Sequence, residues 1–317
     1  MFGLTFLSAT SKTTTHRVVP FRMGRLQSGV AGDVAGGYDS SNISGIDKIT
    51  FPADTKTTLS ATLTTAHRYS AGFANSGVAG YVAGGFGSVA ISNIDKVSFP
   101  ADTKTTLSAT LITARRQPAG FANSGVAGYV AGGNDGSVDL SSIDKIAFPA
   151  ETRTTLSATL TTANSYATGF ANSGVAGYVA GGYATSRIDK ISFPADTKTT
   201  LSATLTTARN SLTGFANSGV AGYAAGGFDS GYISGIDKVS FAADSKTTLS
   251  ATLTTARDAP AGFANSGVAG YAAGGEGGGM QSNIDKVSFP ADTKTTLSAT
   301  LTTARAYASG FADSGTL

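Results

Sequence analysis

Hydrophobic and polar residues alternate along residues 153–162 of the chain. Leu156, Ala158 and Leu160 fall on one side of an extended segment, and threonine and serine fall on the other. A period of two is that of a β-strand with one side buried. Leu156 and Leu160 are also spaced as on a helix, but consecutive β-branched threonines disfavour a helix and no capping residue precedes them. The pattern therefore predicts a strand over residues 153–162.

Three shorter segments precede this strand. Residues 121–126 are mostly small, residues 127–131 end on a Gly-Gly pair, and residues 143–148 stop at Pro149, which cannot donate to a strand ladder. We expect each of these segments to form a short strand. The unit therefore contains four strands.

This four-strand unit is repeated along the chain. The sequence Phe-Ala-Asn-Ser-Gly-Val-Ala-Gly-Tyr occurs five times without change, and a decayed copy precedes the first one. Each copy runs into a Gly-Gly pair, and the pairs are 48, 48, 49, 45 and 48 residues apart. A period of this length is typical of a repeat architecture. The pairs begin at Gly36, Gly84, Gly132, Gly181, Gly226 and Gly274.

Six such units predict an all-β fold, a six-bladed β-propeller whose blades are four-stranded antiparallel sheets. A single unit cannot bury both faces of its own sheet, whereas radial stacking of blades buries them. The first two strands are rich in glycine and alanine, which suits a crowded axis. The later strands carry the larger apolar residues that fill the wider space between diverging blades. A β-solenoid is the alternative, but its rungs are usually shorter than these units.

The repeats resemble those of the kelch family of β-propellers. A kelch repeat has a small-residue first strand, a second strand that ends in Gly-Gly, two further strands and an arginine before the next blade. His67 and Asn164 depart from this pattern, since they stand where the arginine is expected. The arginine is matched by Arg115, Arg209, Arg257 and Arg305.

The tryptophan typical of the fourth kelch strand is absent, and a leucine of each unit is expected to take its packing role. These leucines are Leu59, Leu107, Leu156, Leu201, Leu249 and Leu297. The resemblance covers about residues 24–317 and implies a fold more than a function, because propellers host many activities. The near-identical repeats are more similar to glycine-rich, kelch-like arrays in tail proteins of bacterial viruses than to kelch proteins of the eukaryotic cytoplasm.

The first strand occurs seven times, although six blades need only six copies. A poor copy lies at residues 24–29, and a better copy at residues 310–315 keeps the phenylalanine, Phe311. We expect the C-terminal copy to complete the first blade, because closing the ring removes exposed strand edges. Closure by residues 24–29 is the alternative. The domains would then be an N-terminal attachment arm, 1–28, and the propeller, 29–317.

Composition narrows the function classes. Charged residues make up 14% of the chain and the net charge is +3, so nucleic acid is not expected as a partner. The absence of cysteine and the presence of only two histidines disfavour a metal site. No apolar run approaches the roughly 20 residues of a membrane helix, so membrane insertion is not expected. No phosphate loop or nucleophile elbow occurs, and we expect a protein that is not an enzyme and needs no cofactor.

Two of the four links in each unit differ between repeats, and two are nearly identical. The differing links join the second strand to the third and one blade to the next. In an up-and-down blade these links emerge on one side of the disc, the variable face, and the nearly identical links emerge on the other side, the constant face. Drift in unconstrained loops is one explanation. The identical links are loops as well, however, and they have not drifted.

We therefore interpret the variable face as a recognition surface on a rigid scaffold. Its aromatic, planar and charged side chains provide stacking platforms and paired hydrogen bonds, which suit a sugar or a protein epitope. The candidate ligand-binding residues are Tyr38, Asp39, His67, Arg68, Tyr69, Phe86, Arg116, Asp135, Tyr166, Tyr183, Arg187, Asp229, Tyr232, Glu276 and Tyr307.

Every third strand carries an aspartate that is followed by lysine. Adjacent strand residues point to opposite faces, so the two side chains of one repeat are not expected to pair. A ring of six carboxylates could bind a cation or act as acid and base, but a catalytic site rarely needs six copies of itself. We expect each carboxylate to accept hydrogen bonds from the neighbouring blade or from a loop arginine. These structural residues are Asp47, Asp95, Asp144, Asp189, Asp237 and Asp285.

The first strand carries a repeated asparagine near the expected axis. Lining of a central channel is one role for it, and satisfying backbone groups close to the axis is the role that we favour. The asparagines are Asn75, Asn123, Asn172, Asn217 and Asn265.

These observations predict a non-enzymatic structural or receptor-binding component of a virion, in a phage tail or fibre, with an extracellular location as the alternative. The expected partners are other virion proteins, bound through the N-terminal arm, and a host surface glycan or protein; a homo-oligomer stays open. A secreted or cell-surface lectin-like adhesin and an intracellular kelch-type interaction scaffold are the alternatives. A designed repeat protein is a further explanation, which the six different variable loops disfavour.

Overall fold

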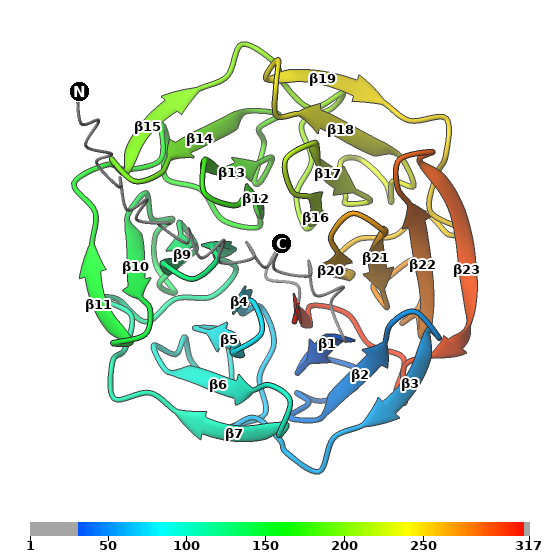
Figure 1. The fold of residues 1–317 in the computed structure, drawn as a ribbon, viewed down its shortest axis with the longest axis horizontal. Helices are drawn as coiled ribbons and strands as arrows, with labels where there is room; N and C mark the ends of the chain where they lie inside the picture. The colour runs from blue at the N-terminus through cyan, green and yellow to red at the C-terminus, as the bar shows by residue number, and fades with distance from the viewer. Residues whose placement is uncertain (1–30, 314–317) are drawn as a thin grey trace, which may run out of the picture.

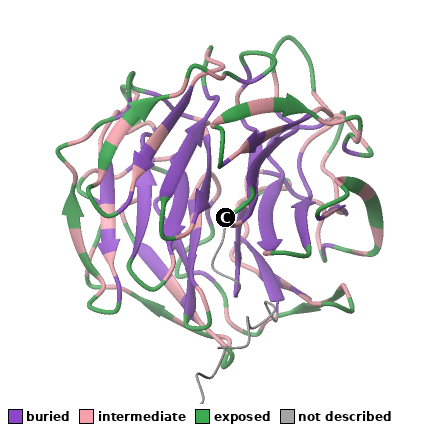
Figure 2. Cartoon of the chain, turned by 45° about the horizontal axis from the view of Figure 1, so that its top comes forward, coloured by how far each residue is buried: buried purple, intermediate pink, exposed green. Residues whose placement is uncertain are grey.

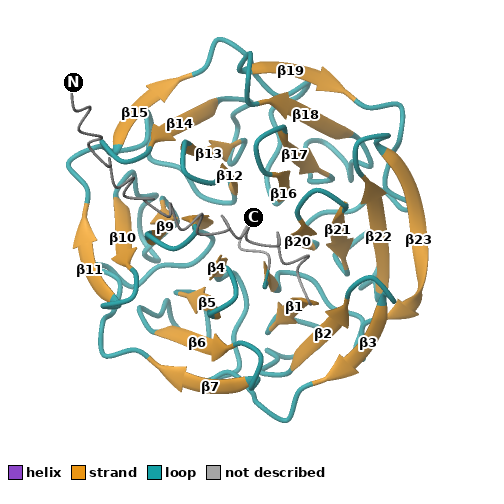
Figure 3. Ribbon diagram, viewed as in Figure 1, coloured by secondary structure: helices purple, strands orange, loops and turns teal. Residues whose placement is uncertain are grey.

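The computed structural model describes residues 31–313, which form six four-stranded antiparallel sheets arranged around an axis (Figure 1). These residues form strands, turns and loops and contain no helix (Figure 3). The predicted six-bladed β-propeller is confirmed. The predicted N-terminal arm, 1–28, lies outside the described residues. Over residues 31–313 there is no helix long and apolar enough to cross a membrane.

The strands of each blade follow one another from the axis to the rim. Blade 1 contains β24 (Ser309–Ala312), β1 (Ala31–Ala35), β2 (Ile46–Thr50) and β3 (Thr55–Thr58). Blade 2 contains β4 (Ala71–Asn75), β5 (Ala79–Ala83), β6 (Ile94–Ser98) and β7 (Thr103–Thr106). Blade 3 contains β8 (Ala119–Asn123), β9 (Ala127–Ala131), β10 (Ile143–Ala147) and β11 (Thr152–Thr155).

Blades 4, 5 and 6 repeat this order (Figure 1). Blade 4 contains β12 (Thr168–Asn172), β13 (Ala176–Ala180), β14 (Ile188–Ser192) and β15 (Thr197–Thr200). Blade 5 contains β16 (Thr213–Asn217), β17 (Ala221–Ala225), β18 (Ile236–Ser240) and β19 (Ser245–Thr248). Blade 6 contains β20 (Ala261–Asn265), β21 (Ala269–Ala273), β22 (Asn283–Ser288) and β23 (Thr293–Thr300).

Blade 1 joins the two ends of the described chain. β24 pairs antiparallel with β1 and places Phe311 opposite Asp33. The backbone N–H of Asp313 donates to the carbonyl of Ala31 (2.9 Å), so the strands meet at the constant face. The predicted closure by the C-terminal strand is confirmed, and the alternative, residues 24–29, lies outside the described residues.

Glycine allows the blades to meet at the axis. One glycine of every innermost strand lies against the backbone of the preceding blade; a Cβ on Gly169, for example, would collide with the carbonyl oxygen of Gly120. No other residue fits such an approach of two backbones. The layer consists of Gly72, Gly120, Gly169, Gly214, Gly262 and Gly310.

Aromatic stacks fill the space between neighbouring blades. Phe73 of the first strand stacks on Tyr81 of the second (ring centroids 5.2 Å apart), and Tyr81 stacks on Phe148 of the next blade (5.1 Å). The innermost two strands are buried and the outermost strand is largely exposed (Figure 2). The core is therefore a set of layers between blades, and burial decreases from the axis to the rim.

The fourth strand is shorter than predicted. β11 covers four residues rather than the whole of 153–162, and its regular pairing with β10 ends at Thr155. Two backbone hydrogen bonds, from Leu156 to Ile143 (2.9 Å) and from Leu160 to Ser141 (2.9 Å), keep the following segment beside the third strand. In blade 6 the same segment continues as β23 across a β-bulge.

The leucines that were expected to replace tryptophan are only half-buried. Leu156, for example, packs on the edge of the core, whereas Leu160, four residues later, is buried. The later leucine of each unit is the better buried one: Leu63, Leu111, Leu160, Leu205, Leu253 and Leu301.

Candidate functional site

The repeated aspartates fasten each blade to the preceding one. In blade 3, Asp144 accepts hydrogen bonds from Thr155 of its own blade (2.6 Å) and from the backbone N–H of Ile112 in the preceding link (2.9 Å). The buried guanidinium of Arg115 lies 3.4 Å from the same carboxylate. Asp47, Asp237 and Asp285 have equivalent arginine and threonine partners. These carboxylates are engaged in blade contacts.

The lysine after each aspartate points to the other side of the sheet. Lys145 donates to Asp196 of the next blade (2.6 Å), and the hydroxyl of the buried Tyr129 donates to the other carboxylate oxygen of Asp196 (2.8 Å). Four more blades repeat this arrangement with the acceptors Asp54, Glu151, Asp244 and Asp292. The lysine of each repeat thus bonds to the next blade, whereas the aspartate bonds to the preceding one.

Near the axis, the repeated asparagines satisfy backbone groups on the constant face. Oδ1 of Asn75 accepts from the backbone N–H of Gly125 in the next blade (3.0 Å). Asn123, Asn172 and Asn217 make the equivalent contact. The constant face is therefore a surface of repeated, mutually bonded turns.

On the variable face, the two differing links of each blade are bonded to each other. Arg68 and Phe86 exchange two backbone hydrogen bonds (3.2 and 2.7 Å) and form an isolated β-bridge. The equivalent bridges join Tyr38 to Ala306, Arg116 to Asn134, Asn210 to Phe228 and Asp258 to Glu276. In blade 4 one such bond remains, from Tyr183 to Ser165 (3.0 Å). The backbone of this face is therefore ordered although its side chains differ.

Six residues form a closed ring of backbone hydrogen bonds around the axis at the variable face. Each N–H donates to the carbonyl oxygen of the equivalent residue in the preceding blade, over distances of 2.5 to 3.1 Å. We name this set the mouth ring, and it consists of Tyr69, Gln117, Tyr166, Ser211, Ala259 and Tyr307. The ring fixes the mouth of the propeller axis.

All six residues of the mouth ring have a left-handed backbone, with φ between 50° and 63°. This conformation favours glycine and asparagine and costs other residues about 1 kcal/mol each. The ring contains neither glycine nor asparagine, and three of its members are tyrosines. Residues other than glycine and asparagine that are held in this strained backbone conformation are concentrated at functional sites.

Among the three tyrosines of the mouth ring, Tyr69 contacts both of the others. The ring of Tyr69 lies 4.4 Å from that of Tyr307 and meets Tyr166 edge-on at 5.9 Å. Burial raises the pKa of Tyr69 to about 12 and also raises the pKa of Tyr166 and of Tyr307. All three hydroxyls are therefore protonated at neutral pH and able to donate hydrogen bonds.

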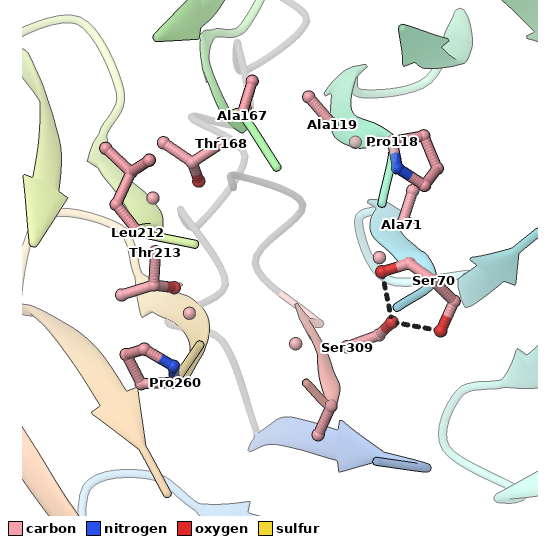
Figure 4. A pocket seen from close by; sticks show the side chains of 17 residues that line it. Ser70, Ala71, Pro118, Ala119, Ala167, Thr168, Leu212, Thr213, Pro260 and Ser309 are labelled. Carbon is pink, nitrogen blue, oxygen red and sulfur yellow. Dashed lines mark hydrogen bonds between the residues drawn. The ribbon is translucent and has the colours of Figure 1, made fainter. Parts of the chain in front are cut away.

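The mouth ring encloses a shallow depression of about 90 Å³. Beneath it lies an axial cavity of about 110 Å³, which the glycine layer and four hydroxyl-bearing residues line. Ser309 bonds there to the hydroxyl of Ser70 (2.7 Å), and Thr168 and Thr213 lie on the other side (Figure 4). The depression is the outer and the cavity the inner part of the same axial opening.

Charges of opposite sign flank the mouth ring. The guanidinium of Arg68 lies over the rings of Tyr38 (4.2 Å) and Phe86 (5.6 Å), and Arg116 lies over Phe86 from the next blade (5.2 Å). These cation–π contacts hold a basic, aromatic cluster over blades 1 to 3.

Blade 6 supplies the acidic side. Asp258 is buried, and its Oδ1 has no hydrogen-bond partner within residues 31–313. Burial, together with the charge of Glu276, raises the pKa of Asp258 to about 7. Glu276 accepts a hydrogen bond from the hydroxyl of Tyr307 (3.2 Å), so the acidic pair adjoins the mouth ring.

His67 was predicted to be a ligand-binding residue of the variable face, but the structure places it in the interior. It is buried, and its Nδ1 lies 2.8 Å from the carbonyl oxygen of Thr65. It fills the interior position that the trailing arginine takes in other blades, so it does not reach the variable face. Burial lowers its pKa accordingly.

The remaining candidates lie further from the axis. Tyr183 and Tyr232 are 67% and 37% exposed at loop tips, and Asp229 is also exposed. Arg187 is half-buried and donates to Thr162 (2.9 Å). The half-buried carboxylates of Asp39 and Asp135 accept hydrogen bonds from the backbone of their own loops. These residues form the outer part of the variable face.

No family model matches the sequence, and no curated protein is similar to it. The fold and the site geometry therefore carry the functional assignment. No group of three or more potential metal ligands occurs over residues 31–313.

The tyrosines fall into two groups, one in the core between blades and one on the variable face. Of the 11 tyrosines, five are buried in the aromatic stacks between blades: Tyr81, Tyr129, Tyr178, Tyr223 and Tyr271. All the others belong to the two differing links and hence to the variable face: Tyr38, Tyr69, Tyr166, Tyr183, Tyr232 and Tyr307. The constant face carries no tyrosine on its described turns.

Sequence comparison of the repeats missed Gln117, Ser211 and Ala259 of the mouth ring, and Asp258 beside it. The signal for the first three was their position as the third residue of a blade-to-blade link, which is structurally equivalent in every repeat although its identity changes. Only the tyrosines at this position were singled out. The left-handed backbone that unites the six residues depends on hydrogen bonds between blades.

The mouth ring gives a first prediction. Ala259→Gly should raise the free energy of unfolding by about 0.5–1 kcal/mol, because glycine adopts the left-handed backbone without strain. Thermal unfolding measures the change. Ala306→Gly is the matched control, because Ala306 is buried nearby and has an ordinary φ, and it should lower stability. An equal loss of stability in both variants would contradict the claim that the backbone of Ala259 is strained.

Proposed function

We propose that the chain is a non-enzymatic recognition component of a virion, similar to kelch-like proteins of phage tails and fibres, which binds the host surface through its variable face. The observation that carries this proposal is the separation of the two faces. Every tyrosine outside the core belongs to the variable face, whereas both ends of the described chain lie at the constant face.

The backbone of the variable face argues against drift. Unconstrained loops that drift differ in backbone as well as in side chain, but here bridges and the mouth ring hold equivalent positions in equivalent conformations. The side chains at these equivalent positions change from blade to blade, while the links between them also differ in length. A constant framework with changing aromatic and charged side chains is the organisation of a recognition surface.

The constant face suits attachment. The chain enters the propeller at Ala31 and leaves it at Asp313, and the two are bonded to each other there. A segment joined to Ala31 would fasten the propeller by its constant face to other virion proteins. The variable face would then point away from the particle.

The repeated carboxylates support a non-enzymatic role. Each of them accepts hydrogen bonds that join neighbouring blades, and this leaves them committed to structure. The kelch-like Gly-Gly pairs and trailing arginines also belong to the scaffold. The links that differ between repeats are confined to the surface that would contact a ligand.

The proposal is tested by binding of the labelled protein to a panel of bacterial strains. Joint replacement of Tyr69, Tyr183, Arg187 and Tyr232 by alanine should weaken binding about tenfold or more. The matched control replaces Val78, Val126 and Val175 by serine; these are exposed on the constant face and should be dispensable. Binding that survives the first set, or that depends on the valines, contradicts recognition by the variable face.

A second measurement addresses the particle. Copurification of the chain with virus particles is the result that we expect. Release into the medium as a free protein with the same binding would instead favour a lectin-like adhesin.

A further inference from the structure

We infer that the mouth ring is the ligand-contacting centre of the variable face and takes the terminal monosaccharide of a glycan, a neutral hexose or N-acetylhexosamine that enters end-on along the axis. This inference rests on the proposed recognition function and adds the chemical class of the ligand and its binding position on the variable face.

The size and position of the depression set the mode of entry. It has a volume of about 90 Å³ and is surrounded by the six residues of the mouth ring. One sugar ring would fill it while projecting into solvent, and a chain of sugars could not lie along it. The glycine layer closes in further down the axis. A glycan would therefore present its end.

The aromatic side of the ring supplies a stacking platform. Tyr69 contacts both Tyr166 and Tyr307, and all three are half-buried, so their rings combine apolar surface with a polar hydroxyl. A pyranose has an apolar face of C–H groups and an edge of hydroxyls, which matches that combination. The protonated phenols donate hydrogen bonds to sugar oxygens.

The opposite side of the ring supplies small and polar groups. Ser211 and Ala259 leave room beside the tyrosines there, whereas the amide of Gln117, which lies between Tyr69 and Tyr166 in the ring, offers both a donor and an acceptor. Asp258 and Glu276 adjoin this side and accept hydrogen bonds, the property that sugar hydroxyls need. Oδ1 of Asp258 is buried and still lacks a partner within residues 31–313.

Charge favours a neutral sugar. The carboxylate of Glu276, and that of Asp258 when it is ionised, lie beside the ring and would repel the carboxylate of an acidic sugar. The guanidinium of Arg68 also lies over the ring of Tyr69 (5.2 Å), so charges of both signs adjoin the mouth ring and neither an acidic nor a basic sugar is favoured. The bonded backbone of the mouth ring also holds the site open in advance, which reduces the entropy lost on binding.

Saturation-transfer difference NMR tests the inference. The probes are methyl glycosides of glucose, galactose, mannose, N-acetylglucosamine and N-acetylgalactosamine, with a sialic acid glycoside as the acidic comparison. We expect transfer to ring C–H protons of at least one neutral glycoside. Tyr69→Ser and Tyr166→Ser should each weaken that binding about tenfold, and serine is tolerated at this position because Ser211 occupies it.

Val126→Ser is the control, since Val126 is exposed on the constant face, away from the mouth ring, and the change should leave glycoside binding unchanged. The inference is overturned if no neutral glycoside binds, if only the sialoside binds, or if the double variant of Tyr69 and Tyr166 binds as well as the unchanged protein. Cell binding that persists in any of these cases leaves the proposed function standing. Absence of cell binding by the unchanged protein overturns the proposed function itself.

Discussion

Asp33→Tyr is expected to stabilise the propeller on the order of 5 kcal/mol at pH 8 and above. Asp33 stands where the other five blades carry the tyrosine of their aromatic stack. The stack around it is preserved: Phe311 and Phe99 lie 6.4 Å apart, as do Phe51 and Phe263 in the neighbouring blade. A tyrosine would fit between the two phenylalanines of blades 1 and 2. Its hydroxyl would reach the acceptor equivalent to the others, Asp102.

The energetic reason is the isolation of the carboxyl group. Asp33 is 0% exposed and neither of its carboxyl oxygens has a hydrogen-bond partner within residues 31–313. Burial raises its pKa to about 8; Asp102 and Asp313 act in the same direction, and Lys48 opposes them. The folded protein therefore keeps a proton that the unfolded chain releases near pH 4. Stability is lost from about pH 4 to pH 8, at about 1.4 kcal/mol per pH unit, and is level above that range.

Denaturant unfolding between pH 5 and pH 9 measures this effect. The difference between Asp33→Tyr and the unchanged protein should widen as the pH rises and become constant above about pH 8. Asp33→Asn is the control that removes the charge without filling the stack, and it should give part of the gain. A difference that does not depend on pH would show that Asp33 ionises without penalty.

Gly169→Ala is expected to lower the free energy of unfolding by more than about 3 kcal/mol. A Cβ at this position would meet the carbonyl oxygen, the carbonyl carbon and the nitrogen of Gly120 in the neighbouring blade. These are backbone atoms, which cannot turn aside as a flexible side chain could. Blades 3 and 4 would have to separate at the axis, where the packing of every blade converges.

Gly231→Ala is the control for this prediction. Gly231 lies in a variable link with an ordinary φ, and nothing lies within 4 Å of a Cβ there. Its replacement should be neutral or slightly stabilising. Equal melting temperatures for the two variants would mean that the blades do not meet as closely at the axis as the structure has them.

Repetition made the fold predictable from the sequence. The strict periodicity predicted the number of blades, and the small residues before each Gly-Gly pair predicted that the first two strands lie at the axis. The better match of Phe311 indicated that the C-terminal strand closes the ring. Each of these inferences depends on a local pattern that six copies make visible.

Features that depend on contacts between blades could not be predicted in the same way. The fourth strand ends at Thr155 because its regular pairing with the third strand stops there, although alternation continues to residue 162. His67 was placed on the surface because links are usually exposed, but it is buried in the position of an arginine. The left-handed mouth ring arises from hydrogen bonds between blades. Asp33 was visible in the sequence as a departure from the repeat, yet its isolation requires the neighbouring phenylalanines.

Hydroxyl-radical footprinting of the protein bound to host cells tests the central claim, that the variable face is the recognition surface. The five core tyrosines are internal references, because they are at most 1% exposed in the free protein. We expect protection of variable-face tyrosines, with Tyr69, Tyr166 and Tyr307 protected most strongly, and unchanged labelling of the exposed valines on the constant face. Protection of those valines, with tyrosine labelling unchanged, would contradict the account.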